Sequence, residues 1–510
     1  MKTYLGVELG STRIKAVAVD GTYRPISSGD HTWSARFENG VWTYGLDEVW
    51  AGLKNALSQV EGRDGFAAAG VSAMMHGYLA FDRDWNLLTP FRTWQNTSTG
   101  PAAAELTERF GFNIPQRWSA AHLYQAILNG EDHVRRIAHV TTLAGYVHHA
   151  LTGVNAVGIG EASGIFPIDS GRLDYDEGML AEFDRLAAAH AVPWTHLRDL
   201  LPRVLTAGES AGSLTAEGGA LLDGLLPTGL PFAPPEGDAG TGMTATNAVA
   251  PRTGNVSAGT SIFSMVVLER PLERVHGEID LVTTPAGRPV AMVHCNNCTG
   301  DTNAWVGVLG EAARLFGADP SPGELYTRLY EKSLEGEPDC GGLFVCNYIA
   351  GEGVTHMDAG RPLVARRPER RFNLANFFRA QLYSTMATLK IGMDILAEEH
   401  VAIDSLTGHG GLFKTPAVGQ RYLAAACNAP VTCMETAGEG GPWGMALLAA
   451  FLVEKTQGEP LEDYLARRVF ADAHCTTQPP RPEDVDGFNT FLAQYKLGLA
   501  VELAAVNSFI

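Results

Sequence analysis

The chain has 510 residues, a formal net charge of −19 and a hydrophobic share of 45%. A single hydrophobic core rarely serves so long a chain, so we expect two domains. The acidic balance argues against a general nucleic-acid or anionic-membrane partner, although a nucleotide pocket needs only local donors.

Targeting signals and cysteines bear on where the protein acts. No basic-then-apolar leader precedes the first expected strand, and no apolar run approaches the roughly 18 residues of a membrane helix. The seven cysteines all lie at or after Cys295, and this odd, sparse set disfavours a secreted disulfide scaffold. We therefore expect a cytoplasmic protein.

The N-terminal half begins with a predicted β-hairpin over residues 4–20, whose tip is Gly10-Ser11-Thr12. Apolar residues at helical spacing predict a helix over 46–60. A buried strand is expected over 66–75, followed by a second hairpin over 78–88.

The C-terminal half restarts with another predicted hairpin, whose tip is Gly259-Thr260-Ser261. A long amphipathic helix is expected over 376–400, and strand–turn–helix pairs follow from 405 to 453, which indicates a layered α/β domain. The expected division is an N-terminal domain over 1–247, a C-terminal domain over 248–475 and a C-terminal helix over 476–510 that packs on the fold.

The two hydroxylated tips are the most informative pattern. They lie 249 residues apart (259 − 10 = 249), close to half the chain. Glycine lets backbone N–H groups approach anionic oxygens, and the hydroxyls add donors, so two such turns across a cleft suit a polyphosphate. Glu8 precedes the first tip and could serve Mg²⁺ through water. The alternative is a strand-end glutamate that faces solvent.

Two further motifs carry reactive side chains. Asp238 lies among the glycines of Glu236–Gly242, where its carboxylate could accept a proton from a hydroxyl. The alternative is an ordinary Asp-Gly turn. Met75-His76-Gly77 ends a predicted strand, where ligands of open α/β sheets gather, although a lone histidine there is often structural.

Two glycine turns and a cysteine pair complete the inventory. Gly408–Gly411 and Gly438–Gly441 follow predicted strands and precede helices, which suits a nucleotide or simply a tight turn. Cys295-Asn296-Asn297-Cys298 has metal or redox spacing, but no second pair with zinc spacing accompanies it, so we interpret it as structural. Neither the P-loop nor the Gly-x-Gly-x-x-Gly dinucleotide signature is present.

Taken in order, these motifs resemble the FGGY family of carbohydrate kinases over nearly the whole chain, most of all its xylulose kinases. Met75-His76-Gly77 is similar to the sugar-contacting Met-His-Gly of those kinases, and Phe91–Asn96 falls where the family has its sugar loop. The resemblance implies an α/β fold of two actin-like ATPase (ribonuclease H-like) domains around a central cleft. It also implies ATP-dependent phosphorylation of a sugar or polyol hydroxyl.

The resemblance implies a role for each matching residue. Asp238 would be the catalytic base, and it would bind the sugar together with Met75, His76, Gly77 and Asn96. Glu8 and Asp238 would lie at the Mg²⁺. ATP would be bound by Gly10, Ser11, Thr12, Lys15, Gly259, Thr260, Ser261, Gly410 and Gly411, with adenosine-binding turns continuing over Gly438–Gly444.

The sequence departs from the family pattern in three places. Glu8 stands where aspartate is usual, His409 lies in a turn that usually holds only small residues, and Gln95-Asn96 replaces the commoner Asn-Asp. The extra methylene of Glu8 moves its carboxylate by about 1.5 Å, which a bridging water would absorb. The third departure bears on which sugar binds.

The leading expected reaction converts D-xylulose to D-xylulose 5-phosphate, with L-ribulose or another sugar or polyol as alternatives. A non-catalytic sugar or nucleotide sensor on the same fold would have lost the base carboxylate, which is present at Asp238. The expected partner is a small sugar, with no nucleic acid and no membrane. A homodimer is a candidate assembly, although no residue pattern fixes the oligomeric state.

Overall fold

The computed structural model describes residues 2–435 and 440–509, which form two compact units. Unit 1 combines residues 2–250 with 275–290 and 440–472, and unit 2 contains the remaining described residues. The first boundary follows Ala250, three residues beyond the expected position. Segments 275–290 and 440–472, which we expected in the C-terminal domain, group instead with unit 1.

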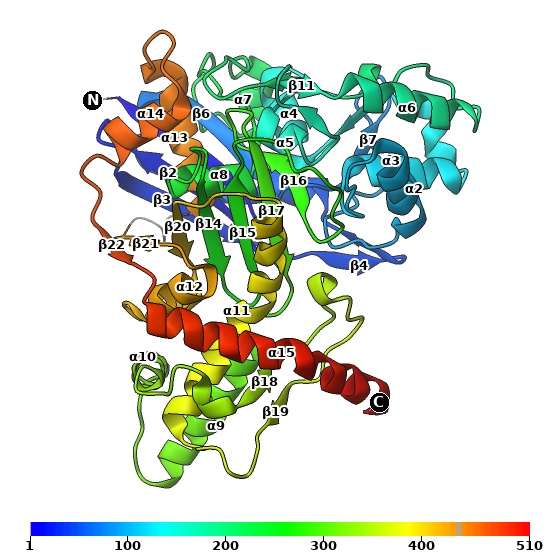
Figure 1. Cartoon of the computed structure of the whole chain (residues 1–510). Coiled ribbons are helices and arrows are strands. Elements are labelled where there is room, and N and C mark those ends of the chain that lie inside the picture. Colours follow the sequence, from blue (N-terminus) through cyan, green and yellow to red (C-terminus); the bar gives the residue numbers. More distant parts are fainter. Residues whose placement is uncertain (1, 436–439, 510) are drawn as a thin grey trace. The chain divides into compact units, whose positions relative to one another are not determined.

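Unit 1 is built on an open five-stranded sheet in the order β13-β6-β1-β2-β3. The expected hairpin is confirmed: β1 and β2 are antiparallel, whereas β6 and β13 continue the sheet in parallel. The elements of unit 1 are β1 (Thr3–Leu9), β2 (Arg13–Val19), β3 (Pro25–Thr32), β4 (Arg36–Glu38), β5 (Val41–Thr43), α1 (Leu46–Ser58), β6 (Phe66–Ala73), β7 (Leu79–Phe81), α2 (Gly100–Phe110), α3 (Ser119–Leu128), β8 (His139–Thr141), α4 (Leu143–Thr152), β9 (Ala156–Gly158), α5 (Ile159–Ala162), β10 (Ile168–Asp169), β11 (Asp174–Tyr175), α6 (Glu177–Ala188), β12 (Arg203–Leu205), α7 (Ala216–Leu221), β13 (Glu236–Gly237), α8 (Asp238–Ala245), β16 (Asp280–Thr283), α13 (Gly440–Glu454) and α14 (Leu461–Tyr464) (Figure 1).

The hairpin expected over 78–88 is only partly formed. β7 pairs with β8, which lies far along the chain, and Phe81 forms a single bridge with Leu87. The Asp82 carboxylate accepts the N–H groups of Asp84 and Asn86 and so closes a tight turn. The sequence did not indicate β8 as the partner of β7, because β8 has only three residues.

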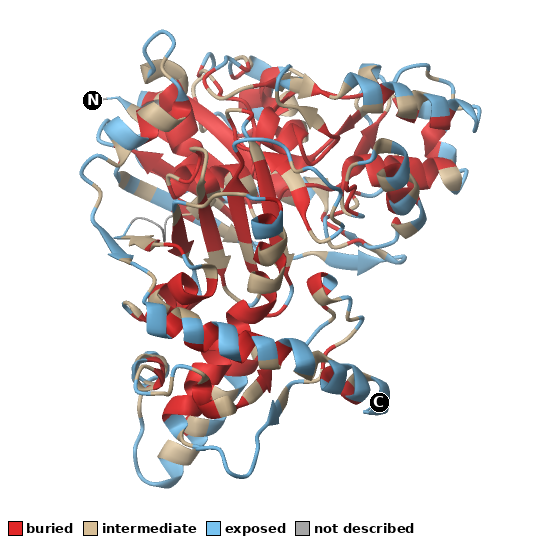
Figure 2. Cartoon of the chain, in the orientation of Figure 1, coloured by how far each residue is buried: buried red, intermediate tan, exposed pale blue. Residues whose placement is uncertain are grey.

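The two faces of β1 bury different helices. Leu5 and Val7 point into a core shared with Leu53 and Leu57 of α1. Gly6 and Glu8 alternate to the opposite face, where α13 packs on β1, β2 and β6. α13 is apolar on every side and almost fully buried, which is typical of a helix inside a core (Figure 2).

Gly6 sets how closely α13 approaches the sheet. A β-carbon there would lie 1.9 Å from Pro442 O and 2.4 Å from Ala446 N. We therefore expect Gly6→Ala to lower the free energy of unfolding by about 1–3 kcal/mol, the usual cost of overpacking. Urea unfolding measures it. Gly307→Ala in α9 (Gly300–Leu315) is the control: nothing lies within 4 Å of a β-carbon at this position, so the substitution should be neutral or stabilising. Equal stability of Gly6→Ala and wild type would contradict the packing.

Unit 2 repeats the strand arrangement of unit 1. β14 and β15 form an antiparallel hairpin, and β14 pairs in parallel with β20, as β1 does with β2 and β6. The sheet continues through β21 to β22. The elements of unit 2 are β14 (Thr253–Ala258), β15 (Ile262–Val267), β17 (Pro289–Cys295), α9 (Gly300–Leu315), α10 (Pro322–Ser333), β18 (Phe344–Cys346), β19 (Leu363–Ala365), α11 (Leu374–Glu398), β20 (Ser405–His409), α12 (Val418–Cys427), β21 (Val431–Met434), β22 (Cys475–Gln478) and α15 (Pro482–Ser508).

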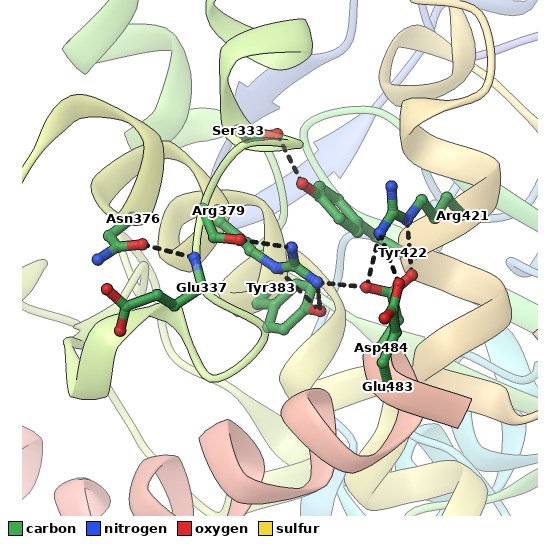
Figure 3. A network of polar contacts seen from close by, with 10 residues as sticks. Ser333, Glu337, Asn376, Arg379, Tyr383, Arg421, Tyr422, Glu483 and Asp484 are labelled. Atoms are coloured by element: carbon green, nitrogen blue, oxygen red, sulfur yellow. Dashed lines mark hydrogen bonds and ion pairs between the residues drawn. The ribbon is translucent and has the colours of Figure 1, made fainter. Parts of the chain in front are cut away.

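A buried charge network fixes the C-terminal helix α15 to unit 2 (Figure 3). Asp484 at the start of α15 accepts from Arg379 Nη2 of α11 at 2.5 Å and from Arg421 Nε of α12 at 2.6 Å. Arg379 also donates to the hydroxyl of Tyr383, whereas Tyr422 shares a hydrogen bond with Ser333. The helix expected near the C-terminus is thus present and anchored in the core by an ion-pair triad.

One negative finding concerns membranes. Among the helices of residues 2–435 and 440–509, none is both long and apolar enough to cross a bilayer.

Candidate active site

The first hydroxylated turn, Gly10–Thr12, joins β1 to β2 and is held by three aromatic residues. Trp33 Nε1 donates to Gly10 O at 2.7 Å, and Tyr44 OH donates to Ser11 O at 2.7 Å. Trp94 Nε1 donates to Ser11 Oγ at 3.3 Å. Because the carbonyls of Gly10 and Ser11 are fixed from one side, the N–H groups of Ser11 and Thr12, which share their peptide planes, are oriented to the other. Sequence reasoning missed all three aromatic supports.

Glu8 lies beside this turn, on the face of β1 that packs against α13. In the register of the β1–β2 hairpin, Glu8 lies opposite Lys15. A β-carbon on Gly441 would lie 1.5 Å from Glu8 Oε2, so the carboxylate occupies the space that this glycine leaves. Burial first and the charge of Asp238 second raise the pKa of Glu8 to about 8, against the opposing effect of Lys15. A cation near Glu8 and Asp238 would relieve this repulsion.

Asp238 is the first residue of α8, and its side chain is exposed. Its Oδ1 accepts the backbone N–H of Met75 at 3.1 Å. Desolvation of the carboxylate by the surrounding protein raises the pKa of Asp238, although the N–H groups of Met75 and Ala239 act in the opposite direction. The result is a fixed, solvent-accessible carboxylate that is a stronger proton acceptor than a free aspartate.

Two fully buried carboxyl groups lie behind Asp238. Glu236 accepts the N–H of Glu161 at 2.9 Å and that of Gly160 at 3.4 Å. Burial raises the pKa of Glu236 to about 8, although these bonds oppose it. Burial, and then the charges of Glu236 and Asp238, hold the pKa of Glu161 well above its usual range, despite a contact with Thr142. No sequence pattern pointed to Glu161, whose carboxyl packs against Gly237.

Met75-His76-Gly77 follows β6 and lies in the same unit as Asp238. The ring of His76 stacks on Trp118, with 6.2 Å between centroids and 19° between planes. His76 has a φ of 71°, and Gly77 has a φ of 100°. Gly77 has no room for a β-carbon, which would lie 2.9 Å from Arg92 O. The backbone is therefore bent sharply at the motif that the sequence associated with the sugar.

Asn96 has a different set of contacts from the one expected of a sugar ligand. Its Oδ1 accepts the N–H of Trp42 at 2.9 Å, and its Nδ2 donates to Trp42 O at 2.9 Å and to Thr93 O at 3.0 Å. The side chain is buried. Because its amide is used to hold two backbone segments together, we leave Asn96 out of the sugar site proposed below.

The second hydroxylated turn, Gly259–Ser261, lies in unit 2 between β14 and β15. The turn that follows β20 packs directly beside it: a β-carbon on Gly410 would lie 2.5 Å from Ala258 O. Gly410 has a φ of 99°, a conformation that glycine adopts readily. The structure thus brings Gly410 and Gly411 together with the second turn, as one nucleotide site would require.

The third glycine turn has another environment. Gly438 lies outside the described residues, and Gly440–Gly444 forms the first turn of α13 in unit 1. A β-carbon on Gly444 would lie 2.0 Å from Thr241 O. These glycines allow close packing of α13 against α8 and β1, which accounts for them without adenosine.

A self-contained metal centre is not found in the part of the chain that the structure describes. No group of three or more His, Cys, Asp or Glu side chains there could hold an ion. The pair of Glu8 and Asp238 offers oxygen ligands only, which suits an ion that shares its coordination with phosphate and water.

The chain belongs to the FGGY family of carbohydrate kinases. The model of the family's N-terminal domain matches residues 3–242, and that of its C-terminal domain matches residues 254–453. The protein is thus a carbohydrate kinase, an enzyme of the phosphotransferase class, and ATP is its phosphoryl donor. Among the members of this family it is xylulokinase-like.

The similar proteins include xylulose kinases and also a kinase named for another substrate. The chain is 20% identical over 457 residues to the xylulose kinase of Haemophilus influenzae, covering 85% of this chain and 87% of that one. It is similar in fold to a solved xylulose kinase of Brucella ovis, with a TM-score of 0.79 and 19% identity over 99% of this chain and 100% of the other. A gluconate kinase of Lactobacillus acidophilus matches with a TM-score of 0.77 and 16% identity over the whole of both chains.

These comparisons confirm the fold class predicted from the sequence. The solved structures that match belong to kinases built from two actin-like ATPase domains, and the repeated strand pattern of units 1 and 2 agrees with that fold. The substrate is confirmed only as far as a sugar, because relatives that act on other acceptors match in fold about as well.

Proposed function

We propose that the enzyme transfers the γ-phosphoryl group of ATP to a hydroxyl of a ketopentose, converting D-xylulose to D-xylulose 5-phosphate. The curated relatives named xylulose kinase and the Met75-His76-Gly77 motif support this choice. L-Ribulose or another sugar or polyol of the same family is the alternative. A non-catalytic sensor is disfavoured because Asp238 is present and accessible.

The observation that carries the proposal is the placement of Asp238. Its carboxylate is exposed, fixed by the N–H of Met75 and next in space to the turn that His76 and Gly77 form. Asp238 accepts the proton of the attacking sugar hydroxyl, which is worth about 10²–10⁴-fold in rate. Met75, His76 and Gly77 hold the sugar. Alignment of the sugar with the phosphate contributes most of the remaining acceleration.

The two hydroxylated turns hold the phosphates of ATP. Gly10, Ser11, Thr12 and Lys15 act from unit 1. Gly259, Thr260 and Ser261 act from unit 2, where Gly410 and Gly411 receive the nucleoside. The proposal requires both sets to act on one triphosphate, because oriented N–H groups stabilise charge that develops on the transferring phosphoryl oxygens.

The residues of unit 1 fit a magnesium ion. Among the described residues no group donates a hydrogen bond to Glu8 Oε2. The donor set of Glu8 and Asp238 consists of carboxylate oxygens, which Mg²⁺ prefers. Bound Mg²⁺ would neutralise charge on the phosphate oxygens. Glu8 and Asp238 would hold it, and the neighbouring Lys15 would orient the phosphates.

The role of Glu8 leads to a prediction about metal requirement. We expect Glu8→Ala to raise the Mg²⁺ concentration for half-maximal activity by about 10–100-fold, as losses of metal-orienting groups do. Glu8→Asp, which restores the side chain usual in the family, should stay near wild type. Activity measured over a magnesium titration decides it. An unchanged Mg²⁺ requirement in folded Glu8→Ala would remove Glu8 from the metal site.

A substrate panel tests the proposed reaction. ADP release is measured with Mg-ATP and with ketopentoses, ketohexoses, polyols and sugar acids. We expect the highest kcat/KM with D-xylulose. A higher value with gluconate or L-ribulose would change the proposed substrate and leave the assignment as a kinase intact, whereas no stimulation by any of them would favour the sensor.

A cytoplasmic location and a homodimer stay predictions from the sequence.

A further inference from the structure

The Cys295–Cys298 loop joins β17 to α9 in unit 2, and its thiols are not in a reactive state. Both cysteines are buried. Burial raises the pKa of Cys298 to about 12 and holds that of Cys295 well above its usual range. The thiolate is the form that attacks disulfides, so burial disfavours a redox role for this loop. The backbone and the asparagines of the loop instead make hydrogen bonds that connect it to neighbouring segments.

The end of the loop supports the second hydroxylated turn from behind. Cys298 N donates to Thr260 O at 2.9 Å. Thr299 donates twice to Gly259 O, from its backbone N at 3.2 Å and from Oγ1 at 2.7 Å. Three hydrogen bonds therefore fix the carbonyls of Gly259 and Thr260. Fixing these peptide planes also fixes the direction of the N–H groups on their other side.

Asn297 holds this part of the loop in place. Its Oδ1 accepts the N–H groups of Ile349 at 2.9 Å and Ala350 at 3.0 Å. Its Nδ2 donates to Ala350 O and to Glu352 Oε2, both at 3.1 Å, and its backbone N donates to the same Glu352 oxygen at 3.2 Å. Asn297 is 2% exposed and Glu352 is 1% exposed.

Such a network is costly to bury and rigid once its bonds are made. Buried polar groups must find partners, and a connected set specifies one backbone arrangement. An apolar side chain at 297 would fill the space without defining the path of residues 297–299. A path defined to a fraction of an ångström matters where oriented N–H groups meet a phosphate.

From these contacts we infer that Asn297 and Glu352 are positioning residues for ATP: they fix the 297–299 backbone, which in turn orients the Gly259–Ser261 turn toward the phosphates. The inference rests on the proposed function, because that function assigns the turn to ATP. Neither side chain touches ATP itself. Their effect should therefore appear in nucleotide binding and leave sugar binding alone.

The test compares Asn297→Ala with its neighbour Asn296→Ala. Asn296 is exposed, and its side chain donates to Gly351 O at 2.8 Å, so it touches the same segment. Asn296 contacts Glu352 through its backbone N–H, which the substitution to alanine retains. We expect Asn297→Ala to weaken binding of a non-hydrolysable ATP analogue by about tenfold, measured by calorimetry, and to raise the KM for ATP equally. The KM for the sugar should not change. Asn296→Ala should behave as wild type.

Two further variants keep the test decisive if Asn297→Ala does not fold. Glu352→Gln retains an oxygen that accepts from Asn297, so near wild-type ATP affinity is expected. Thr299→Val removes the Oγ1 bond to Gly259 with little change of shape and should weaken ATP binding severalfold, in the direction of Asn297→Ala.

The outcomes separate this inference from the proposed function. Wild-type protein that fails to bind the ATP analogue would overturn the proposed function and this inference with it. Wild-type binding together with unchanged ATP affinity in folded Asn297→Ala and Thr299→Val would overturn the inference alone. An equal rise of both KM values with a lower Tm would show a general structural role and would also overturn it.

Discussion

Replacing Asp238 with asparagine should lower kcat by about 10²–10⁴-fold, because an amide cannot accept the proton of the sugar hydroxyl. Asparagine has the same shape and still offers an oxygen to the N–H of Met75, so the fold should persist. Steady-state kinetics with the best sugar of the panel give kcat, and circular dichroism reports folding.

A matched control separates the chemistry from the loss of a charge. Asp47 lies in the first turn of α1, is exposed like Asp238 and belongs to the same unit. Asp47→Asn removes a charge near a helix N-terminus, which is worth about 0.3–1 kcal/mol of stability. Its kcat should equal that of wild type. A folded Asp238→Asn enzyme with near wild-type kcat would exclude Asp238 as the base.

Replacing Asp484 with alanine should destabilise unit 2 by about 3–5 kcal/mol, the usual cost of breaking a buried ion pair. The side chains of Arg379 and Asp484 are each 1% exposed, and that of Arg421 is 16% exposed. Removal of the carboxylate leaves a guanidinium buried without a counter-charge. Urea unfolding followed by circular dichroism measures the loss.

The exposed neighbour Glu483 is the control for this prediction. Its carboxylate lies 3.8 Å from Arg421 and is 67% exposed, so Glu483→Ala should cost about 0–1 kcal/mol. Equal stability of Asp484→Ala and Glu483→Ala would show that the triad does not anchor α15.

The same triad has a pH dependence with a definite sign. Burial alone would raise the pKa of Asp484, but hydrogen bonds from Arg421 and Arg379 outweigh it and hold the pKa below its ordinary value. The stabilisation is therefore complete above about pH 4, the unfolded pKa of aspartate, and is lost as the pH falls through the folded pKa. The difference in free energy of unfolding between wild type and Asp484→Asn should therefore become smaller as the pH is lowered below about 4.

The strand pairs at the heart of each unit could be predicted from the sequence. Alternating or continuous apolar residues around a Gly-hydroxyl tip define β1–β2 and β14–β15, and both hairpins are present. The helices α1 and α11 also match their expected ranges to within a few residues. These signals are local, so a single sequence suffices to detect them.

The path of α13 could not be predicted in this way. A helix that is apolar on every side carries no face that indicates its partner, and neighbours in sequence placed it in the C-terminal domain. Its packing in unit 1 depends on Gly6, because the missing side chain of Gly6 leaves room for Pro442. Gly6 lies 434 residues before the start of α13 at Gly440 (440 − 6 = 434). Composition and residue spacing do not indicate such long-range steric fits.

In the candidate site, too, some residues could be predicted from the sequence and others could not. Motifs with unusual residue types, such as Asp238 among glycines or the hydroxylated tips, could be found from the sequence. Supporting residues could not: Trp33 and Glu161 are ordinary core positions until the fold brings them to the turn and to Asp238. Asn96 had the right chemistry for a sugar, but its hydrogen bonds are satisfied by Trp42 and Thr93.

The most direct test of the account follows the γ-phosphate itself. ATP with a radiolabelled γ-phosphate is incubated with D-xylulose and enzyme, and the products are separated. We predict that wild type transfers the label to the sugar in step with ADP formation, whereas Asp238→Asn does not. Label that stays in ATP with every sugar of the panel, is released only as inorganic phosphate, or reaches the sugar equally fast in Asp238→Asn would contradict the account.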